Sequence, residues 1–310
     1  MHQFLTSARL FPRIARRHTT SFALCISVLL PAPAPASEID KLLSLPEEKI
    51  DVGVAALTFA KEIYPLIDIP TYSLQIDAIA EGARQTIARY GRNDPESIIR
   101  AMNTYFYKEY GVRYDKSPGA RAKQENYFIN GILDSKQGQC ITIPMLYMAV
   151  AQRLGYPVYP VIAPEHTFVR FVNSSLKEQN IELSSGAGYS TDEDYAYKLN
   201  INPKAIRAGA YLRTLTYREF LATLLQQNAL VFASRGNLDK AIRYFEKAQR
   251  IDSRNPYFPK NLAGLWASKA KLASSPEATQ AFRLKSYRYF QRAEDLGWTH
   301  DPDANTRSNK

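Results

Sequence analysis

The chain has few of the side chains that ligate metals or form disulfides. Its 310 residues include two cysteines and four histidines, and Cys25 and two of the histidines lie within residues 1–36. The rest of the sequence keeps Cys140, His166 and His300. One thiol cannot form an internal disulfide, and two histidines far apart in sequence lack the spacing of a zinc site. A phosphate-binding motif is also absent from the sequence, so we expect no metal and no cofactor.

The chain also lacks an apolar run long enough to cross a membrane. Residues 22–30 form a short apolar run, whereas a helical span requires roughly 20 residues. A basic stretch without acids precedes this run, and the small residues Ala34 and Ala36 follow it. That order is typical of a secretory signal peptide cleaved before Ser37, the alternative being a weak anchor. We therefore expect residues 1–36 to direct export to the periplasm or cell envelope, with no integral membrane span after signal removal.

The charge pattern does not indicate a nucleic-acid partner. The formal net charge is +10, and four of the arginines lie in residues 1–36, which leaves 36 basic and 30 acidic residues in the remainder. No block of lysines and arginines with interleaved aromatic residues occurs in the sequence. We expect a solvated basic surface and no nucleic-acid binding.

The apolar spacing changes twice along the chain and divides it into parts. Residues 37–111 have helical spacing, and residues 112–215 mix turns, one strong helix and strand-like runs. Residues 216–298 return to helical spacing, and the polar residues 299–310 are expected to be a disordered tail. The predicted fold class is α+β, with a helical segment before the mixed core and a helical pair of repeats after it.

Cys140 lies where a glycine-containing turn meets a predicted helix. Apolar residues recur at Leu146, Ala149 and Val150, the spacing of one helical face. Pro144 is tolerated only in a first turn, so the helix must begin close to residues 140–143. Free backbone N–H groups and the positive end of the helix dipole favour thiolate over thiol at that place. The alternative is an inert core cysteine, against which this helix-terminal position argues.

Two predicted strands follow the cysteine helix and bring a histidine near an acid. Val158–Ile162 and His166–Val172 are rich in β-forming residues, and extended structure resumes at Asn180. If the second hairpin closes symmetrically about Ser174, His166 lies opposite Glu182. A register shift by two would favour Asn180 instead, and a slip by one would turn both away from His166.

These side chains are the parts of acyl transfer through a thioester. Cys140 would attack a carbonyl, His166 would hold the proton for the leaving amine, and Glu182 or Asn180 would orient the imidazole. The backbone N–H of Cys140 is one natural donor to the oxyanion. A side-chain amide would be the second donor, and the candidates are Asn126, Gln137 and Gln139.

The C-terminal helices follow a repeat pattern. Thr216 and Glu219 have the spacing of a capping box. The helices that follow match the spacing of a tetratricopeptide repeat, with a degenerate second copy around Trp266 and Phe290; the first copy carries Ala229, Phe232, Gly236, Ala241, Phe245 and Ala248. Two repeats cannot bury a solenoid core alone, so we expect them to dock on the preceding domain.

Three motifs resemble the transglutaminase-like superfamily. They are Gln137-Gly138-Gln139-Cys140-Ile141-Thr142, the run from Pro164 to Arg170 that contains His166, and Asn180-Ile181-Glu182. Over roughly residues 48–296 the chain resembles a bacterial branch of that superfamily that ends in tetratricopeptide repeats. The resemblance implies a papain-like core with the cysteine helix packed on an antiparallel sheet. It also implies that Cys140 is the nucleophile, His166 the base and Glu182 the third member, and it favours Asn126 for the oxyanion.

Two functions follow from this reading. The first is an exported cysteine peptidase, amidase or transamidase that acts on a peptide or protein substrate through a thioester at Cys140. The second is a non-catalytic envelope protein, whose repeats bind a protein partner and whose core is a retired enzyme.

Overall fold

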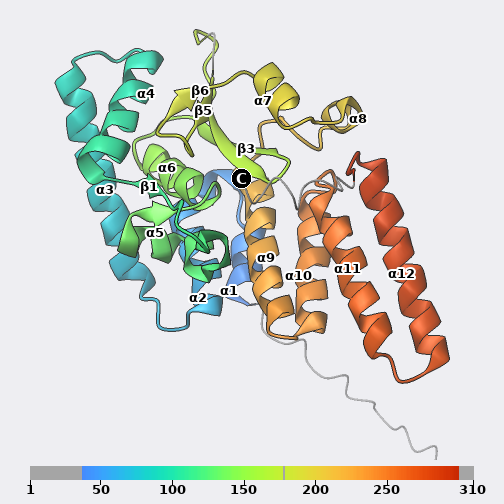
Figure 1. Cartoon of the computed structure of the whole chain (residues 1–310). Helices are drawn as coiled ribbons and strands as arrows, with labels where there is room; N and C mark the ends of the chain where they lie inside the picture. The colour runs from blue at the N-terminus through green and yellow to red at the C-terminus, as the bar shows by residue number, and fades with distance from the viewer. Residues whose placement is uncertain (1–36, 177–178, 300–310) are drawn as a thin grey trace, which may run out of the picture. The chain divides into compact units, whose positions relative to one another are not determined.

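The computed structural model describes residues 37–176 and 179–299 (Figure 1). The predicted signal segment 1–36 and the tail from residue 300 onward lie outside the described residues. In chain order the described part comprises an N-terminal group of helices, a segment of short helices around Cys140, an antiparallel sheet, and a C-terminal group of helices. The mixture of helices with small sheets agrees with the predicted α+β class.

The N-terminal helices begin and end at local signals in the sequence. They are α1 (Glu38–Ser44), α2 (Val52–Ile63), α3 (Ile69–Tyr90) and α4 (Pro95–Thr104), and α4 continues as a π-helical turn at Tyr105–Tyr110. The Asp94 side chain accepts a hydrogen bond from the Ser97 N–H, and Pro95 occupies the first helical position. Gly91 ends α3 with a φ of 65°, a conformation that favours glycine.

The segment before Cys140 contains a helix that the sequence pattern did not predict. Strand β1 (Arg113–Tyr114) pairs in parallel with β2 (Gln137–Gly138). Helix α5 (Ile129–Ser135) belongs to the segment of sequence that connects these two strands. A helix of this length covers about two turns, which is too short for an apolar repeat to be recognised. No larger residue fits at Gly131 in α5, because a Cβ there would lie 2.1 Å from the backbone oxygen of Glu125.

The cysteine helix is buried on all sides. Helix α6 runs over Thr142–Arg153, which confirms the start predicted from Pro144, and every residue from Thr142 to Ala151 is buried. It contacts α2, α3 and α5, as well as the strands that follow it. The sequence predicted one apolar face, but the helix is apolar nearly all round, as expected of a central core helix.

The sheet has the strand order β3-β4-β5-β6 and is antiparallel throughout. Its strands are β3 (Val158–Ala163), β4 (His166–Phe171), β5 (Asn180–Glu182) and β6 (Gly188–Tyr189). Arg170 pairs with Asn180, so the β4–β5 hairpin closes about residue 175 and not about Ser174. The symmetric register was therefore wrong by two residues: continuing the observed pairing puts Ser184 directly opposite His166. Glu182 still shares the face of His166, because a shift by two preserves the alternation of side chains.

The C-terminal helices pack as successive neighbours and also on the core. After α7 (Asp192–Lys198) and α8 (Pro203–Arg207) come α9 (Tyr217–Ser234), α10 (Leu238–Ile251), α11 (Tyr257–Leu272) and α12 (Pro276–Asp295). Helices α9, α10 and α11 each pack on the helix that follows, and α9 also contacts α2 and β3 (Figure 1). The predicted capping box is present, with reciprocal bonds between Thr216 and Glu219.

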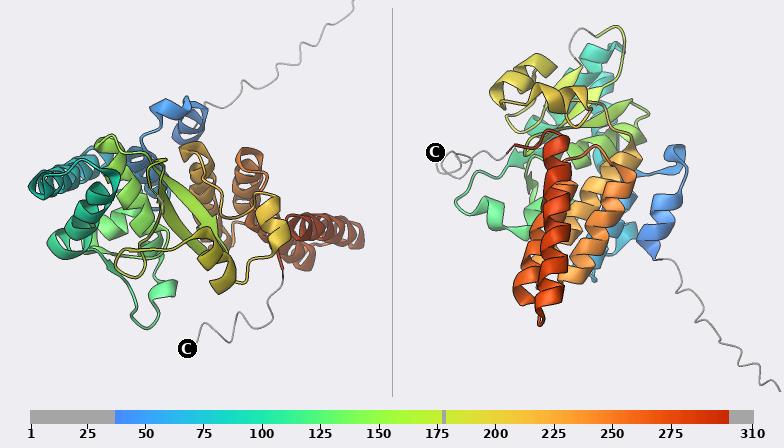
Figure 2. Two further views of the ribbon diagram at one scale, coloured as in Figure 1. Left: turned by 90° about the horizontal axis from the view of Figure 1, so that it is seen from above. Right: turned by 90° about the vertical axis from the view of Figure 1, so that its right-hand side faces the viewer.

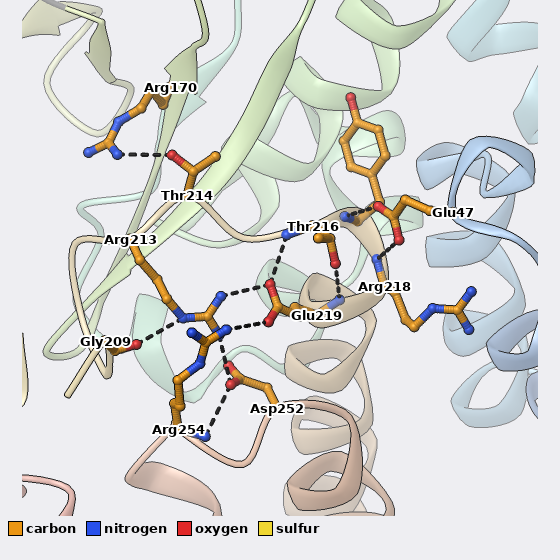
Figure 3. Close-up of polar contacts among 11 residues, drawn as sticks. Glu47, Arg170, Gly209, Arg213, Thr214, Thr216, Arg218, Glu219, Asp252 and Arg254 are labelled. Carbon is orange, nitrogen blue, oxygen red and sulfur yellow. Dashed lines mark hydrogen bonds and ion pairs between the residues drawn. The ribbon is translucent and has the colours of Figure 1, made fainter.

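A polar cluster joins the core to these helices (Figure 3). The guanidinium of Arg213 lies 2.7 Å from Glu219 Oε2 and 2.7 Å from Asp252 Oδ1, and its Nε donates to the Gly209 carbonyl. Arg254 adds a second contact to Glu219 at 2.9 Å. Burial raises the pKa of Asp252 despite the nearby Arg213, so this junction depends on the arginine being present.

Candidate active site

Cys140 lies in the turn between β2 and α6, two residues before the first helical residue. Its side chain is half-buried, and Sγ is 3.7 Å from the backbone oxygen of Glu165. The turn is closed by the Gln139 N–H, which donates to Thr142 Oγ1 at 2.9 Å. A Cβ at Gly138 would lie 2.4 Å from the same hydroxyl oxygen, so a larger residue there would push the turn away from α6. Among the described residues, none accepts a hydrogen bond from the Cys140 N–H.

His166 and Glu182 form a close pair on one face of the sheet. His166 Nε2 lies 2.7 Å from Glu182 Oε2, and the two side chains are only 17% and 15% exposed. Glu182 Oε1 accepts the Ser184 N–H at 2.7 Å. The carboxylate is therefore held at both oxygens, and Nδ1 is the imidazole nitrogen that Glu182 does not contact.

Within this pair, each side chain stabilises the charged form of the other. Burial by itself lowers the pKa of His166, but hydrogen bonds with Cys140 and Glu182 outweigh it and raise that pKa from 6.5 to about 9. Burial by itself raises the pKa of Glu182, but the His166 contact and the Tyr195 hydroxyl lower it to about 2. At neutral pH the pair is thus an imidazolium and a carboxylate.

Tyr195 belongs to this site and was not predicted. Its hydroxyl donates to Glu182 Oε2 at 2.7 Å, and its ring stacks on Phe168 with centroids 4.0 Å apart. Tyr195 comes from α7, which begins at a capping box formed by Thr191 and Asp194. The capping box could have indicated the helix, but no local pattern distinguishes Tyr195 from the exposed Tyr197 on the same helix.

Asn126 does not have the free amide that an oxyanion donor needs. Its Nδ2 donates to Asp115 Oδ2 at 2.8 Å and to the Ala120 carbonyl at 2.9 Å, which uses both amide hydrogens. Asn126 is buried, and its backbone carbonyl accepts a hydrogen bond from the Thr142 hydroxyl. Gln139 is also engaged, because Nε2 donates to the Asp115 carbonyl. Both amides are thus hydrogen-bonded to the segment around Asp115, and in this structure neither amide hydrogen of Asn126 is available to an oxyanion.

The side chain of Asn180 lies on the same sheet face as His166, but its hydrogen-bond partners are other residues. Its Oδ1 accepts from Arg170 Nε at 2.7 Å, and its Nδ2 donates to Asp192 at 2.8 Å. The register explains this outcome, since Asn180 lies directly opposite Arg170. Of the two candidates for the third position, the structure brings only Glu182 to the imidazole.

The turn between β3 and β4 is held by a residue from the C-terminal helices. Glu165 adopts a φ of 52°, which is uncommon for a residue other than glycine, and its N–H donates to the Tyr257 hydroxyl at 2.9 Å. Tyr257 is the first residue of α11. Because Glu165 also accepts the Cys140 thiol contact and precedes His166, α11 takes part in positioning both candidate residues.

The described residues contain no group of three or more His, Cys, Asp or Glu side chains that could hold a metal ion. In the same part of the chain, none of the helices combines the length and the apolar character that a membrane span requires.

Comparison with protein families places this geometry in context. A profile described as the transglutaminase-like superfamily matches residues 70–226, half of the chain, and the match contains Cys140, His166 and Glu182. The chain belongs to the transglutaminase-like superfamily. The match begins within α3, so the transglutaminase-like region takes in helices α4 and α5 as well as the sheet.

Similar proteins share low identity with this transglutaminase-like chain. A UPF0162 protein of Buchnera aphidicola is 24% identical over 169 residues, which are 53% of this chain and 61% of that protein. The chain thus spans less than two thirds of that relative. Protein SirB1 of Salmonella typhimurium is 22% identical over 62% of this chain and 71% of its own length. Among solved structures, menin aligns with a TM-score of 0.46 and 13% identity, over 87% of this chain and 71% of menin.

Proposed function

We propose that the protein is a thiol-dependent acyl-transfer enzyme, a peptidase, amidase or transamidase acting on a peptide or protein amide. The observation that carries the proposal is the His166–Glu182 pair, 2.7 Å apart, together with Cys140 Sγ, which lies 3.7 Å from the backbone oxygen of the residue before His166. A thiol, an imidazole and a carboxylate in that order are the groups that thioester chemistry requires. Membership in the transglutaminase-like superfamily supports the same class of reaction.

The proposed reaction has two stages. The Cys140 thiolate forms a bond to the carbonyl carbon, and the C–N bond breaks as His166, which holds the proton that the thiol has lost, gives that proton to the leaving amine. The Cys140 N–H, which is unpaired within the described chain, donates to the oxyanion that forms in between. Water or an amine then attacks the thioester, loses a proton to His166, and releases the thiolate.

Glu182 would act through the imidazole. Its carboxylate contacts Nε2, which leaves Nδ1 for the sulfur and the leaving group. The charge of Glu182 also keeps the imidazolium stable, so that the proton is present when the amine departs.

The test uses p-nitrophenyl acetate as a generic acyl donor and iodoacetamide as a thiol probe, with modification mapped to Cys140 by peptide mass spectrometry. We expect an acetyl group on Cys140 and fast alkylation near pH 7, with His166→Ala slower by about a hundredfold. Cys140→Ser should not be acetylated at that position. Glu193→Gln, which neutralises an exposed acid on α7, is the matched control and should react like the wild type. Equal rates for the wild type and His166→Ala would reject the proposal.

The alternative is a non-catalytic protein whose C-terminal helices bind a partner. The observation in its favour is an open hollow on the last two helices, described below. If Cys140→Ser retains the biological function of the protein, the binding role is favoured over the catalytic one. Either role would be carried out in the periplasm or cell envelope if residues 1–36 direct export, which processing of the N-terminus in cells would test.

A further inference from the structure

The last helix of the C-terminal group, α12, buries few of its side chains. Helix α10 buries Ala241, Ile242, Phe245 and Ala248, whereas α12 buries Ala293 alone among its residues. Leu284 is 49% exposed and Tyr287 is 59% exposed, both on α12. In the right-hand view of Figure 2, α12 lies nearest the viewer, as the outermost of the four helices. In a stack of helical repeats, such an end needs a polar face or another helix to cover it.

A hollow lies between the last two helices. Its volume is about 370 Å³, and its lining includes Ala267, Ala270, Lys271, Arg283, Tyr287 and Phe290. A second hollow of about 620 Å³ lies at the turn between the helices and shares Arg283 with the first. The two hollows together form a groove between α11 and α12. A third helix can pack into the groove between two adjacent helices. The groove therefore has the shape of a helix-binding site with an apolar floor.

Beyond residue 36, the net positive charge of the sequence comes from this group of helices. Residues 216–298 contain fourteen basic and seven acidic residues, whereas residues 37–215 contain twenty basic and twenty-one acidic ones. Lys240, Lys247 and Lys269 are paired with Glu62, Asp40 and Asp239. Lys271 and Arg283 form no ion pair with any acid in the described part of the chain, and no acidic residue lines either hollow. The cations at the groove are thus free to meet negative charge from outside.

We propose that the groove between α11 and α12 binds an amphipathic helix of another protein, with acidic residues beside its apolar stripe. The apolar stripe would cover Ala267, Ala270 and Phe290 and pack against Tyr287, in the place of a next helix in the stack. The acidic residues would pair with Lys271 and Arg283. Binding of this kind is independent of Cys140, so it stands or falls separately from the proposed catalysis.

The test measures binding of synthetic peptides to the whole protein by fluorescence anisotropy. One peptide, on the order of 20 residues long, carries leucines at helical i, i+4 and i+7 spacing with glutamates beside them. The second peptide has lysines in place of the glutamates. We expect the acidic peptide to bind more tightly than the basic one by at least about tenfold, with an affinity that falls as salt is added.

Two charge reversals on the same helix locate the contact. Arg283→Glu should weaken binding of the acidic peptide by about tenfold or more, because Arg283 lines both hollows. Arg288→Glu changes the net charge equally but lies outside both linings, so it should weaken binding less than about twofold. Both residues are exposed, so both variants should keep the helical circular dichroism of the wild type.

Each other outcome overturns the proposal. Equal weakening by the two reversals would mean that attraction is spread over the surface and not seated in the groove. Failure of the acidic peptide to bind at concentrations on the order of 100 μM would remove the proposed partner class. A self-associated protein that Tyr287→Asp converts to monomer in sedimentation would mean that a second copy of the chain covers the groove. Cys140→Ser should bind the peptide like the wild type, which separates this result from the test of catalysis.

Discussion

Replacing Glu182 by glutamine should lower the pKa of His166. Glutamine keeps the shape of the side chain and an oxygen near Nε2, but it removes the charge that stabilises the imidazolium. The pKa of His166 is raised from 6.5 to about 9, against a burial effect that acts in the opposite direction. A net rise of that size corresponds to about 3 kcal/mol in favour of the protonated form, after the opposing effect of burial. Cys140 and Glu182 supply them together, so removing one should lower the pKa by about 1 to 2 units.

The same change should alter the pH dependence of stability. His166 has a raised pKa in the folded state, so its contribution is fully present below pH 6.5 and is lost as the pH rises through about 9. Glu182 has a lowered pKa, so its contribution is present above pH 4.5 and is lost as the pH falls through about 2. The wild type should therefore exceed Glu182→Gln in free energy of unfolding most clearly between pH 4.5 and 6.5, with the difference shrinking towards pH 9.

The assay is an NMR titration of the histidine ring signals, with the His166 signal assigned by its loss in His166→Ala. Tyr195→Phe removes one hydrogen bond to Glu182 but leaves the charge, so it should give a value between the wild type and Glu182→Gln. Glu193→Gln removes an exposed carboxylate from α7, the helix that carries Tyr195, and should leave the titration unchanged. A His166 pKa in Glu182→Gln that stays within a few tenths of the wild-type value would refute the assignment of Glu182 as its charge partner.

Three further predictions concern polar contacts made by the C-terminal helices. Tyr257→Phe leaves the Glu165 N–H without its acceptor, so we expect a loss of about 1 kcal/mol in urea unfolding and slower alkylation of Cys140, whereas unchanged alkylation would argue against a positioning role. Arg213→Met leaves two carboxylates without their guanidinium and should cost about 3 kcal/mol at pH 7. That loss should be smaller in acid, because Asp252, whose pKa burial raises above 3.8, takes up a proton there; a loss independent of pH would contradict this account. Thr216→Ala removes the cap of α9 and should cost about 1 kcal/mol, which thermal unfolding against the wild type would check.

The parts of the fold that local chemistry controls could be read from the sequence. Pro144 placed the start of the cysteine helix, Thr216 and Glu219 placed the start of α9, and the run after His166 was predicted as a strand. These features depend on residues within one or two turns of each other, so the pattern contains the information. Helix α5 was missed because two turns of helix carry too little periodicity.

The sequence predicted part of the candidate site. What it left open or missed concerns which side chains meet in the folded chain. The sequence named His166 and left Glu182 and Asn180 as alternatives, because both residues fall on the same face of one strand. The pairing of Arg170 with Asn180 decides between them, and the length of the connection between the two strands left that register open in the sequence. Asn126 was preferred from resemblance, but its amide is used by Asp115, a partner eleven residues earlier in the chain.

The sequence by itself determined the residue types and their local frames: one thiol at the start of a helix, and an imidazole and two polar candidates on neighbouring strands. Only the tertiary structure decided which groups meet. Tyr195 reaches Glu182 from α7, and Tyr257 reaches Glu165 across 92 positions in the chain. Contacts of that kind depend on how whole elements pack, and packing follows from the combined burial of many distant side chains, which no short window of sequence contains.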